Sequence, residues 1–143
     1  MNTRSRIEEV CGALGLRFSP AGHDSIIIRF GPPTTSIVVQ ARDLVVKLDR
    51  PCGIVLQSAL PAAIQEANRL NAEIMPMGAF TVRERDRLLS FGLALIAPTG
   101  LTPEQLDIGL AAVVLNPFAA RFAPFLEQTL GDLDCTRWWN GAA

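Results

Sequence analysis

The chain has 143 residues, of which 49% are hydrophobic and 19% are charged, and its 13 basic and 14 acidic side chains leave a formal net charge of -1. This length predicts one domain with one core, and the low share of charged residues predicts that a partner or a second copy covers part of the surface. A nearly neutral chain lacks the clustered positive charge that holds a polyphosphate backbone, so we expect no nucleic-acid partner.

The cysteines and the N-terminal residues indicate a cellular compartment. Cys11, Cys52 and Cys135 are far apart and odd in number, whereas a disulfide framework or zinc site needs paired or closely spaced ligands. We interpret them as buried thiols in the reducing cytoplasm. Glu8 and Glu9 lie where a signal peptide would be apolar, and we expect no apolar run of the roughly 18 residues that a membrane span needs.

The first half of the chain predicts one helix followed by a meander of strands. A helical spacing of apolar residues over 3–14, with Thr3 as a possible cap, predicts the helix. Runs rich in β-branched residues, separated by turn-forming residues, then predict three or four antiparallel strands. These strands are expected at residues 16–19, 25–30, 37–41 and 44–48. The secondary structure of residues 51–58 is ambiguous, since Ile54, Val55 and Leu56 could either extend the sheet or lead into a helix.

The second half predicts a helix, a hairpin and a last helix. Apolar residues at helical spacing predict a helix over 59–73, and residues 80–83 and 88–95 predict a hairpin. The clearest local signal lies at 101–106, where Thr102 suits the N-cap, Pro103 the first turn and Gln105 a capping box. We expect the last helix to run to about Leu130, bent or restarted near Pro117 and disturbed near Pro124.

No composition shift divides the chain, so we expect one domain over residues 1–131 and a C-terminal tail over 132–143. The tail carries Trp138 and Trp139, two large aromatic residues that expose much apolar area unless they dock. They are candidates for contact with this domain, with a second copy or with a partner.

Other candidate contact residues lie on the second predicted helix and the hairpin. Asn68 and Asn71 share a helical face, and their amides suit strand backbone, a partner's backbone or the end of their own helix. Arg83 and Arg85 belong to a run of five charges at the hairpin tip, which is either solvated or suited to an acidic partner. Phe80, which opens the hairpin, is the remaining candidate.

The residues predict no catalytic, metal or cofactor site. The only histidine, His23, lies in a turn, and no serine or cysteine lies in a nucleophile elbow. Glu104, Asp107, Asp132 and Asp134 lack the spacing of a calcium loop, and no glycine-rich phosphate loop is present. We therefore expect no cofactor and no enzymatic activity.

Three strings of residues give a family resemblance. Asn68-Arg69-Leu70-Asn71, Gly78-Ala79-Phe80 and the segment 101–106 resemble the bacterial YbjN family of proposed sensory transduction regulators. The order of elements resembles the type III secretion chaperones. That resemblance implies a compact domain that forms homodimers and binds extended segments of client proteins, with no family catalytic residues.

These observations predict an α+β fold, an antiparallel sheet with helices in the order α-β-β-β-(β)-α-β-β-α. The function that we expect is a protein-binding module, a chaperone-like adaptor that acts as a homodimer through non-covalent contacts. Its mechanism would be strand addition or groove binding. The alternatives are a regulatory protein in a bacterial signalling or stress pathway and, more distantly, an enzyme with an unrecognised site.

Overall fold

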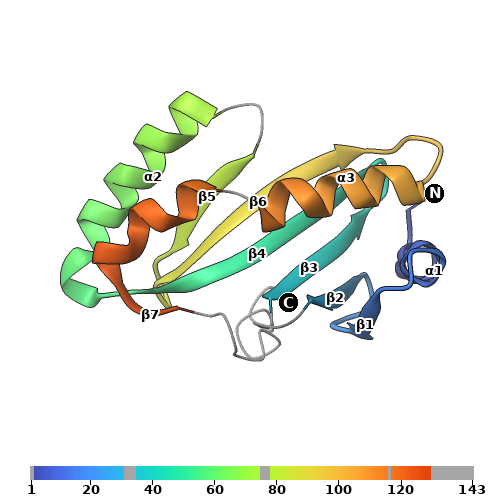
Figure 1. Cartoon of the computed structure of the whole chain (residues 1–143), viewed down its shortest axis with the longest axis horizontal. Helices are drawn as coiled ribbons and strands as arrows, with labels where there is room; N and C mark the ends of the chain where they lie inside the picture. Colours follow the sequence, from blue (N-terminus) through green and yellow to red (C-terminus); the bar gives the residue numbers. More distant parts are fainter. Residues whose placement is uncertain (1, 31–34, 75–77, 116, 130–143) are drawn as a thin grey trace.

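The computed structural model describes residues 2–30, 35–74, 78–115 and 117–129 (Figure 1). The elements in chain order are α1 (Arg4–Ala13), β1 (Arg17–Pro20), β2 (Ser25–Phe30), β3 (Thr35–Arg42), β4 (Val45–Val55), the 3₁₀ helix η1 (Gln57–Ala59), α2 (Leu60–Ile74), β5 (Ala79–Arg83), β6 (Leu88–Ile96), α3 (Pro103–Val114), the 3₁₀ helix η2 (Pro117–Phe125) and β7 (Leu126–Thr129). This order confirms the predicted α+β class, although the described elements after α3 differ from the prediction.

The strands form one antiparallel sheet in the order β1-β2-β3-β4-β6-β5, and β7 pairs with β4 beyond the end of β3. The predicted meander corresponds to β1 to β4, and the predicted hairpin to β5 and β6. The ambiguous stretch continues β4 as a strand to Val55 and then turns into η1. Strands β1 and β5 lie at the two ends of this strand order, and β7 is paired with β4 alone.

The three α-helices pack on one face of the sheet. Alternate strand residues point toward the helices, so Ile26 and Ile28 of β2 share one cluster with the buried residues of α1, α2 and α3. Helix α2 lies over β5, and α3 lies over β4 and β6 (Figure 1). On the opposite face, Ile27 and Val38 pack against Ala21 and are also fully buried. Strands β2 and β3 thus each bury one apolar residue on this second face, between polar neighbours such as Arg29 and Gln40.

The last predicted helix is shorter than expected. Helix α3 ends at Val114, where Arg50 of β4 donates hydrogen bonds from Nη1 to the carbonyls of Val113 and Val114 at 3.4 and 3.0 Å. The chain continues as η2 from Pro117, since proline has no N–H to donate to a helix. The expectation of helix up to Leu130 was wrong, because residues 126–129 form β7.

The absence of a side chain at Gly53 lets β7 approach β4. Gly53 pairs with Thr129, and a Cβ at Gly53 would lie 2.6 Å from the carbonyl oxygen of Gln128. Pairing with β4 satisfies main-chain groups that a helix over the same residues would have satisfied internally.

The stretch from α3 to η2 is apolar. By length and composition Pro103–Phe125 could cross a membrane, with a mean hydropathy of 1.5, so the expectation that no run reaches that length was wrong. One such segment is weak evidence for a membrane span, because core helices of soluble proteins have the same composition. Its Leu106, Leu110, Val113 and Phe122 are buried in the core that α3 and η2 form with the sheet.

The start of α3 is capped as predicted. Thr102 Oγ1 accepts a hydrogen bond from the N–H of Gln105, and the Gln105 side chain accepts one from the N–H of Thr102. Because Thr102→Ala removes the first acceptor, we expect it to lower the free energy of unfolding by about 0.5 to 2 kcal/mol in denaturant melts. Thr102→Ser keeps the acceptor, and Thr99→Ala alters an exposed threonine of the preceding turn. An equal loss for either control would contradict the prediction.

Candidate functional site

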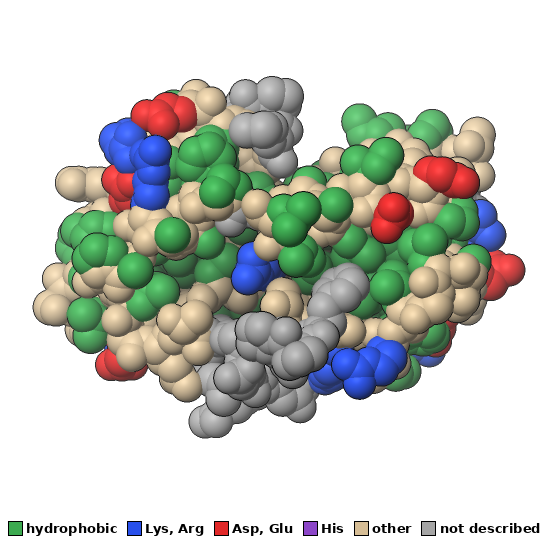
Figure 2. Space-filling model, viewed as in Figure 1, with side chains coloured by type: hydrophobic (Ala, Val, Ile, Leu, Met, Phe, Trp, Pro, Cys, Tyr) green, Lys and Arg blue, Asp and Glu red, His purple; other side chains and the backbone are tan. Residues whose placement is uncertain are grey.

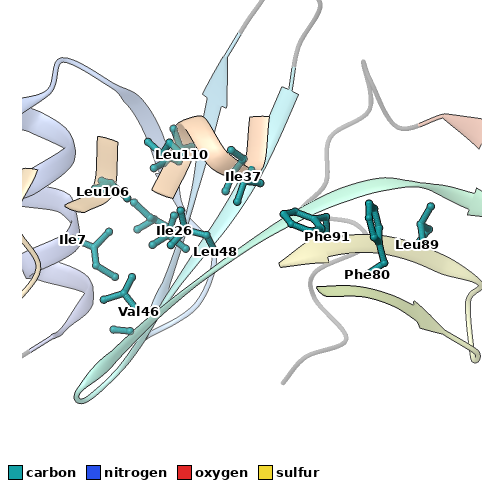
Figure 3. Packing of buried hydrophobic residues seen from close by; sticks show 14 of the residues in the cluster. Ile7, Ile26, Ile37, Val46, Leu48, Phe80, Leu89, Phe91, Leu106 and Leu110 are labelled. Atoms are coloured by element: carbon teal, nitrogen blue, oxygen red, sulfur yellow. The ribbon is translucent and has the colours of Figure 1, made fainter. Parts of the chain in front are cut away.

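The core beneath α2 is built around Phe80. Phe80 is 1% exposed, and its ring lies 4.9 Å, centroid to centroid, from each of the rings of Phe91 and Phe122. Figure 3 shows Phe80, Leu89 and Phe91 together, on a different part of the sheet from Ile7 and Ile26. The Phe80 side chain therefore lies in the core. The prediction that it belongs to an accessible contact surface was wrong.

The side chain of Asn71 binds the main chain of Phe80. Asn71 Nδ2 donates to the Phe80 carbonyl at 2.8 Å, and the Phe80 N–H donates to Asn71 Oδ1 at 2.7 Å. The Asn71 amide thus makes the two hydrogen bonds that a neighbouring strand would make at this position. Of the alternatives open for Asn71, the one realised is the pairing with exposed strand backbone.

The main-chain N–H and carbonyl of one further residue of the β5 edge face outward. In an antiparallel pair, residues alternate between pointing their main-chain groups toward and away from the partner strand. Since Phe80 points away from β6, Val82 also points away. Among the described residues, none hydrogen-bonds the N–H or the carbonyl of Val82. The sheet therefore ends in an unpaired donor and acceptor at Val82.

A groove of about 500 Å³ runs between α2 and this edge. Its described lining is Ile64, Ala67, Asn68, Asn71, Phe80, Thr81, Val82 and Glu84. The side chains of Ile64 and Val82 are half-buried, and Asn68 is exposed at the rim. The structure thus brings Asn68, Asn71 and the main chain of Phe80 to one place. The sequence reasoning missed Val82 and Ile64, although the Asn71 pattern pointed to strand backbone nearby.

The arginines of the hairpin lie elsewhere. Arg83 donates from Nε and Nη2 to the Asp86 carboxylate, with the shortest of these bonds at 2.6 Å. Partial burial alone would raise the pKa of Asp86, but its hydrogen bonds and the charge of Arg83 outweigh burial and lower that pKa. Arg85 is exposed at the hairpin tip. The prediction that Arg83 and Arg85 contact a partner stays a prediction.

The face of the sheet opposite the helices has a small hollow of about 250 Å³. Its described lining is Val38, Gln40, Arg42, Lys47, Asp49, Pro51, Thr81, Arg83, Leu88 and Ser90. The Asp49 carboxylate lies over Gly92, where a Cβ would overlap its Oδ1 atom. Burial raises the pKa of Asp49, and the charge of Lys47 only partly opposes this.

The half-buried Asp49 carboxylate predicts an unusual dependence of stability on pH. Because the pKa of Asp49 is higher in the folded than in the unfolded chain, its contribution to stability is full below the unfolded pKa of about 3.9 and is lost as pH rises through the folded pKa. We expect Asp49→Asn to raise the melting temperature at pH 7 and to leave it unchanged near pH 3. Exposed Asp107, changed to Asn, is the control. Destabilisation at pH 7 would contradict the prediction.

The remaining sequence candidates carry no site in the part of the chain that the structure describes. Cys11 and Cys52 are free thiols, and burial raises the pKa of each to about 11. His23 is exposed in its turn. Within the described ranges no three His, Cys, Asp or Glu side chains could hold a metal ion. Trp138, Trp139 and Cys135 lie outside the described residues, as do residues 130–143 as a whole.

Two solved structures share the fold. The crystal structure of YbjN from E. coli, described as "a putative transcription regulator", is 13% identical with a TM-score of 0.61, and the match covers 87% of this chain and 93% of that one. The ExsC-ExsE complex contains a chain that is 15% identical with a TM-score of 0.57, over 88% of this chain and 97% of that one. The fold thus resembles that of the ExsC secretion chaperone.

The sequence itself gives a family. No curated protein matches the chain. The model of the YbjN family, described as "putative bacterial sensory transduction regulator", matches residues 3–121. This match covers most of the chain and includes all three strings of residues that suggested the resemblance, and the chain therefore belongs to the YbjN family.

Proposed function

We propose that this protein is a non-catalytic adaptor of the bacterial cytoplasm that acts as a homodimer and binds an extended segment of a partner protein at the edge of β5. The observation that carries the proposal is the unpaired N–H and carbonyl of Val82 beside the groove between α2 and β5. An extended segment placed there gains main-chain hydrogen bonds from Val82, and alternate side chains enter the groove.

The groove favours an apolar side chain on the bound segment. The residue that pairs with Val82 points to the same side of the sheet as Val82, which is the side of Ile64 and Ala67 of α2. Because Asn71 already occupies the edge at Phe80, the segment pairs at Val82 and extends toward Glu84. The residue opposite Val82 is therefore the one whose side chain the groove selects.

Two observations support protein binding. The site that the described residues form offers main-chain donors and acceptors with apolar walls. The fold is also shared with a chain whose structure was determined in a complex with ExsE. An adaptor of this kind can regulate a pathway through contacts alone, in agreement with the description of the family.

A labelled synthetic peptide of alternating valine and threonine tests the site directly. We expect it to raise fluorescence anisotropy on binding and to shift the amide resonances of Val82 and Ile64 but not those of β1, the strand at the opposite end of the strand order. The same peptide with prolines at the pairing positions should not bind, because proline lacks the N–H. Binding that shifts β1 instead, or no binding at millimolar peptide, would overturn the proposed site.

Two variants sharpen this test. Val82→Pro removes the outward N–H, and an edge strand tolerates proline where its N–H faces solvent. Ile64→Ala removes part of the groove wall, while exposed Gln65→Ala, one position along the same helix, is the matched control. We expect the first two to weaken peptide binding and the control to leave it unchanged. Melting temperatures of all three show whether a loss of binding comes from unfolding.

A further inference from the structure

The outward face of α3 carries apolar side chains where a surface helix usually carries charge. Ile108 and Leu115 are 70% and 75% exposed, and Ala111 and Ala112 between them are also exposed. No charged residue occurs from position 108 to position 120. Figure 2 shows hydrophobic side chains gathered along this part of the molecule. We refer to Ile108, Ala111, Ala112 and Leu115 as the α3 stripe.

The α3 stripe borders an apolar groove of about 450 Å³. The described lining of this groove is Ile74, Phe91, Ala111, Ala112, Leu115, Pro117 and Phe118. A protruding side chain at one end of the stripe, Ile108, thus lies on the same surface as a hollow at the other end. A surface that carries both a projection and a hollow can pair with itself.

We propose that the α3 stripe is the interface between two copies of this chain, packed antiparallel about a two-fold axis that passes between Ala111 and Ala112. The proposal deepens the proposed function, because it assigns a surface to the homodimer. The order large, small, small, large at positions 108, 111, 112 and 115 follows one helical face. In the antiparallel arrangement Ile108 of each copy faces Leu115 of the other, beside the groove, and the alanines allow the two helices to approach closely.

The chemistry of the surface favours a second copy over a lipid surface. The nearest charges before the stripe are the acidic Glu104 and Asp107, whereas helices that bind anionic membranes carry Lys and Arg beside their apolar face. Helix α3 has 12 residues and a length of about 18 Å. It cannot alone supply the roughly 800 Å² per partner of a standard interface, so the groove walls at Ile74 and Phe118 must join it.

Sedimentation of the full chain over a micromolar concentration range tests the interface. We expect the mass to rise from 15.5 kDa toward twice that value. Ile108→Lys and Leu115→Glu should each weaken dimerisation more than tenfold, because each places a charge against an apolar residue of the other copy. Both residues are exposed, so neither change disturbs the core. Ile96→Lys, at a residue 74% exposed on β6, is the matched control and should have no effect.

The double variant Ile108→Lys with Leu115→Glu decides the geometry. The two-fold arrangement sets the new lysine of each copy against the new glutamate of the other, so we expect dimerisation to recover relative to both single variants. A monomer at every concentration, a dimer insensitive to both single variants, or binding of the monomer to phosphatidylglycerol vesicles through the same residues would overturn the proposal. The monomeric variants should still bind the alternating valine-threonine peptide. Loss of the dimer with retained peptide binding therefore separates this interface from the β5 site.

Discussion

Replacing Phe80 by alanine is expected to lower the free energy of unfolding by about 3 to 5 kcal/mol, the range for a large buried aromatic residue. The ring lies between Phe91 and Phe122 and joins β5, β6 and η2 in one core. Its loss leaves a cavity that all three elements line. Since small domains are stable by only about 5 to 15 kcal/mol, this change removes a large part of the total. Denaturant unfolding followed by circular dichroism measures it.

Two controls accompany the change at Phe80. Phe80→Leu keeps most of the buried volume and should cost clearly less. Phe18→Ala on β1 removes a half-buried ring at the opposite edge of the sheet, and a smaller loss is expected there too. Equal losses of unfolding free energy at Phe18 and Phe80 would show that the contact among the three rings adds no stability of its own.

Replacing Asn71 by alanine is expected to lower the free energy of unfolding by about 2 to 4 kcal/mol. The change leaves the N–H and the carbonyl of Phe80 without partners, at about 1 to 3 kcal/mol for each buried unsatisfied group. Because water reaches this part-buried edge, we expect the combined cost of the two groups to lie below the upper limit of that range. Thermal and denaturant melts provide the measurement.

Asn68→Ala is the matched control for Asn71, one helical turn earlier on α2. Asn68 is exposed, so the change should alter stability by no more than about 0.5 kcal/mol.

Asn71→Ala also opens the β5 edge at Phe80 in addition to Val82, and longer open edges promote pairing between sheets. We therefore expect this variant to bind the alternating peptide in a second register. Unchanged stability and an unchanged register together would contradict the role assigned to Asn71.

Local signals in the sequence predicted the elements that depend on neighbouring residues. The capping box of Thr102 and Gln105 acts over three residues and was confirmed. The end of α3 depends instead on Arg50, which lies 63 positions before Val113. The strand character of β7 depends on the close approach to Gly53. Neither contact leaves a periodic pattern, so the sequence predicted a continued helix where the structure has a strand.

The candidate site was predicted only in part, because its position also depends on contacts between residues that are distant in the chain. The spacing of Asn68 and Asn71 indicated a shared helical face. Which strand that face contacts depends on tertiary packing and could not be predicted from the spacing. Phe80 was expected at a contact surface and lies in the core, because the residue alternation along β5 turns its ring toward α2 and its main chain toward Asn71. The α3 stripe was not predicted, because an uncharged run in a sequence does not show which of its residues are exposed.

The pairing partners of β4 impose an order on folding. Strand β4 pairs with β3, which precedes it, and with β6 and β7, which the ribosome delivers much later. Until then the nascent chain holds a meander whose last strand has one unsatisfied side. Contacts between residues so distant in the chain form slowly because closing long loops costs entropy. During synthesis this side of β4 therefore keeps unpaired main-chain donors and acceptors until β6, which follows α2 in the chain, pairs with it.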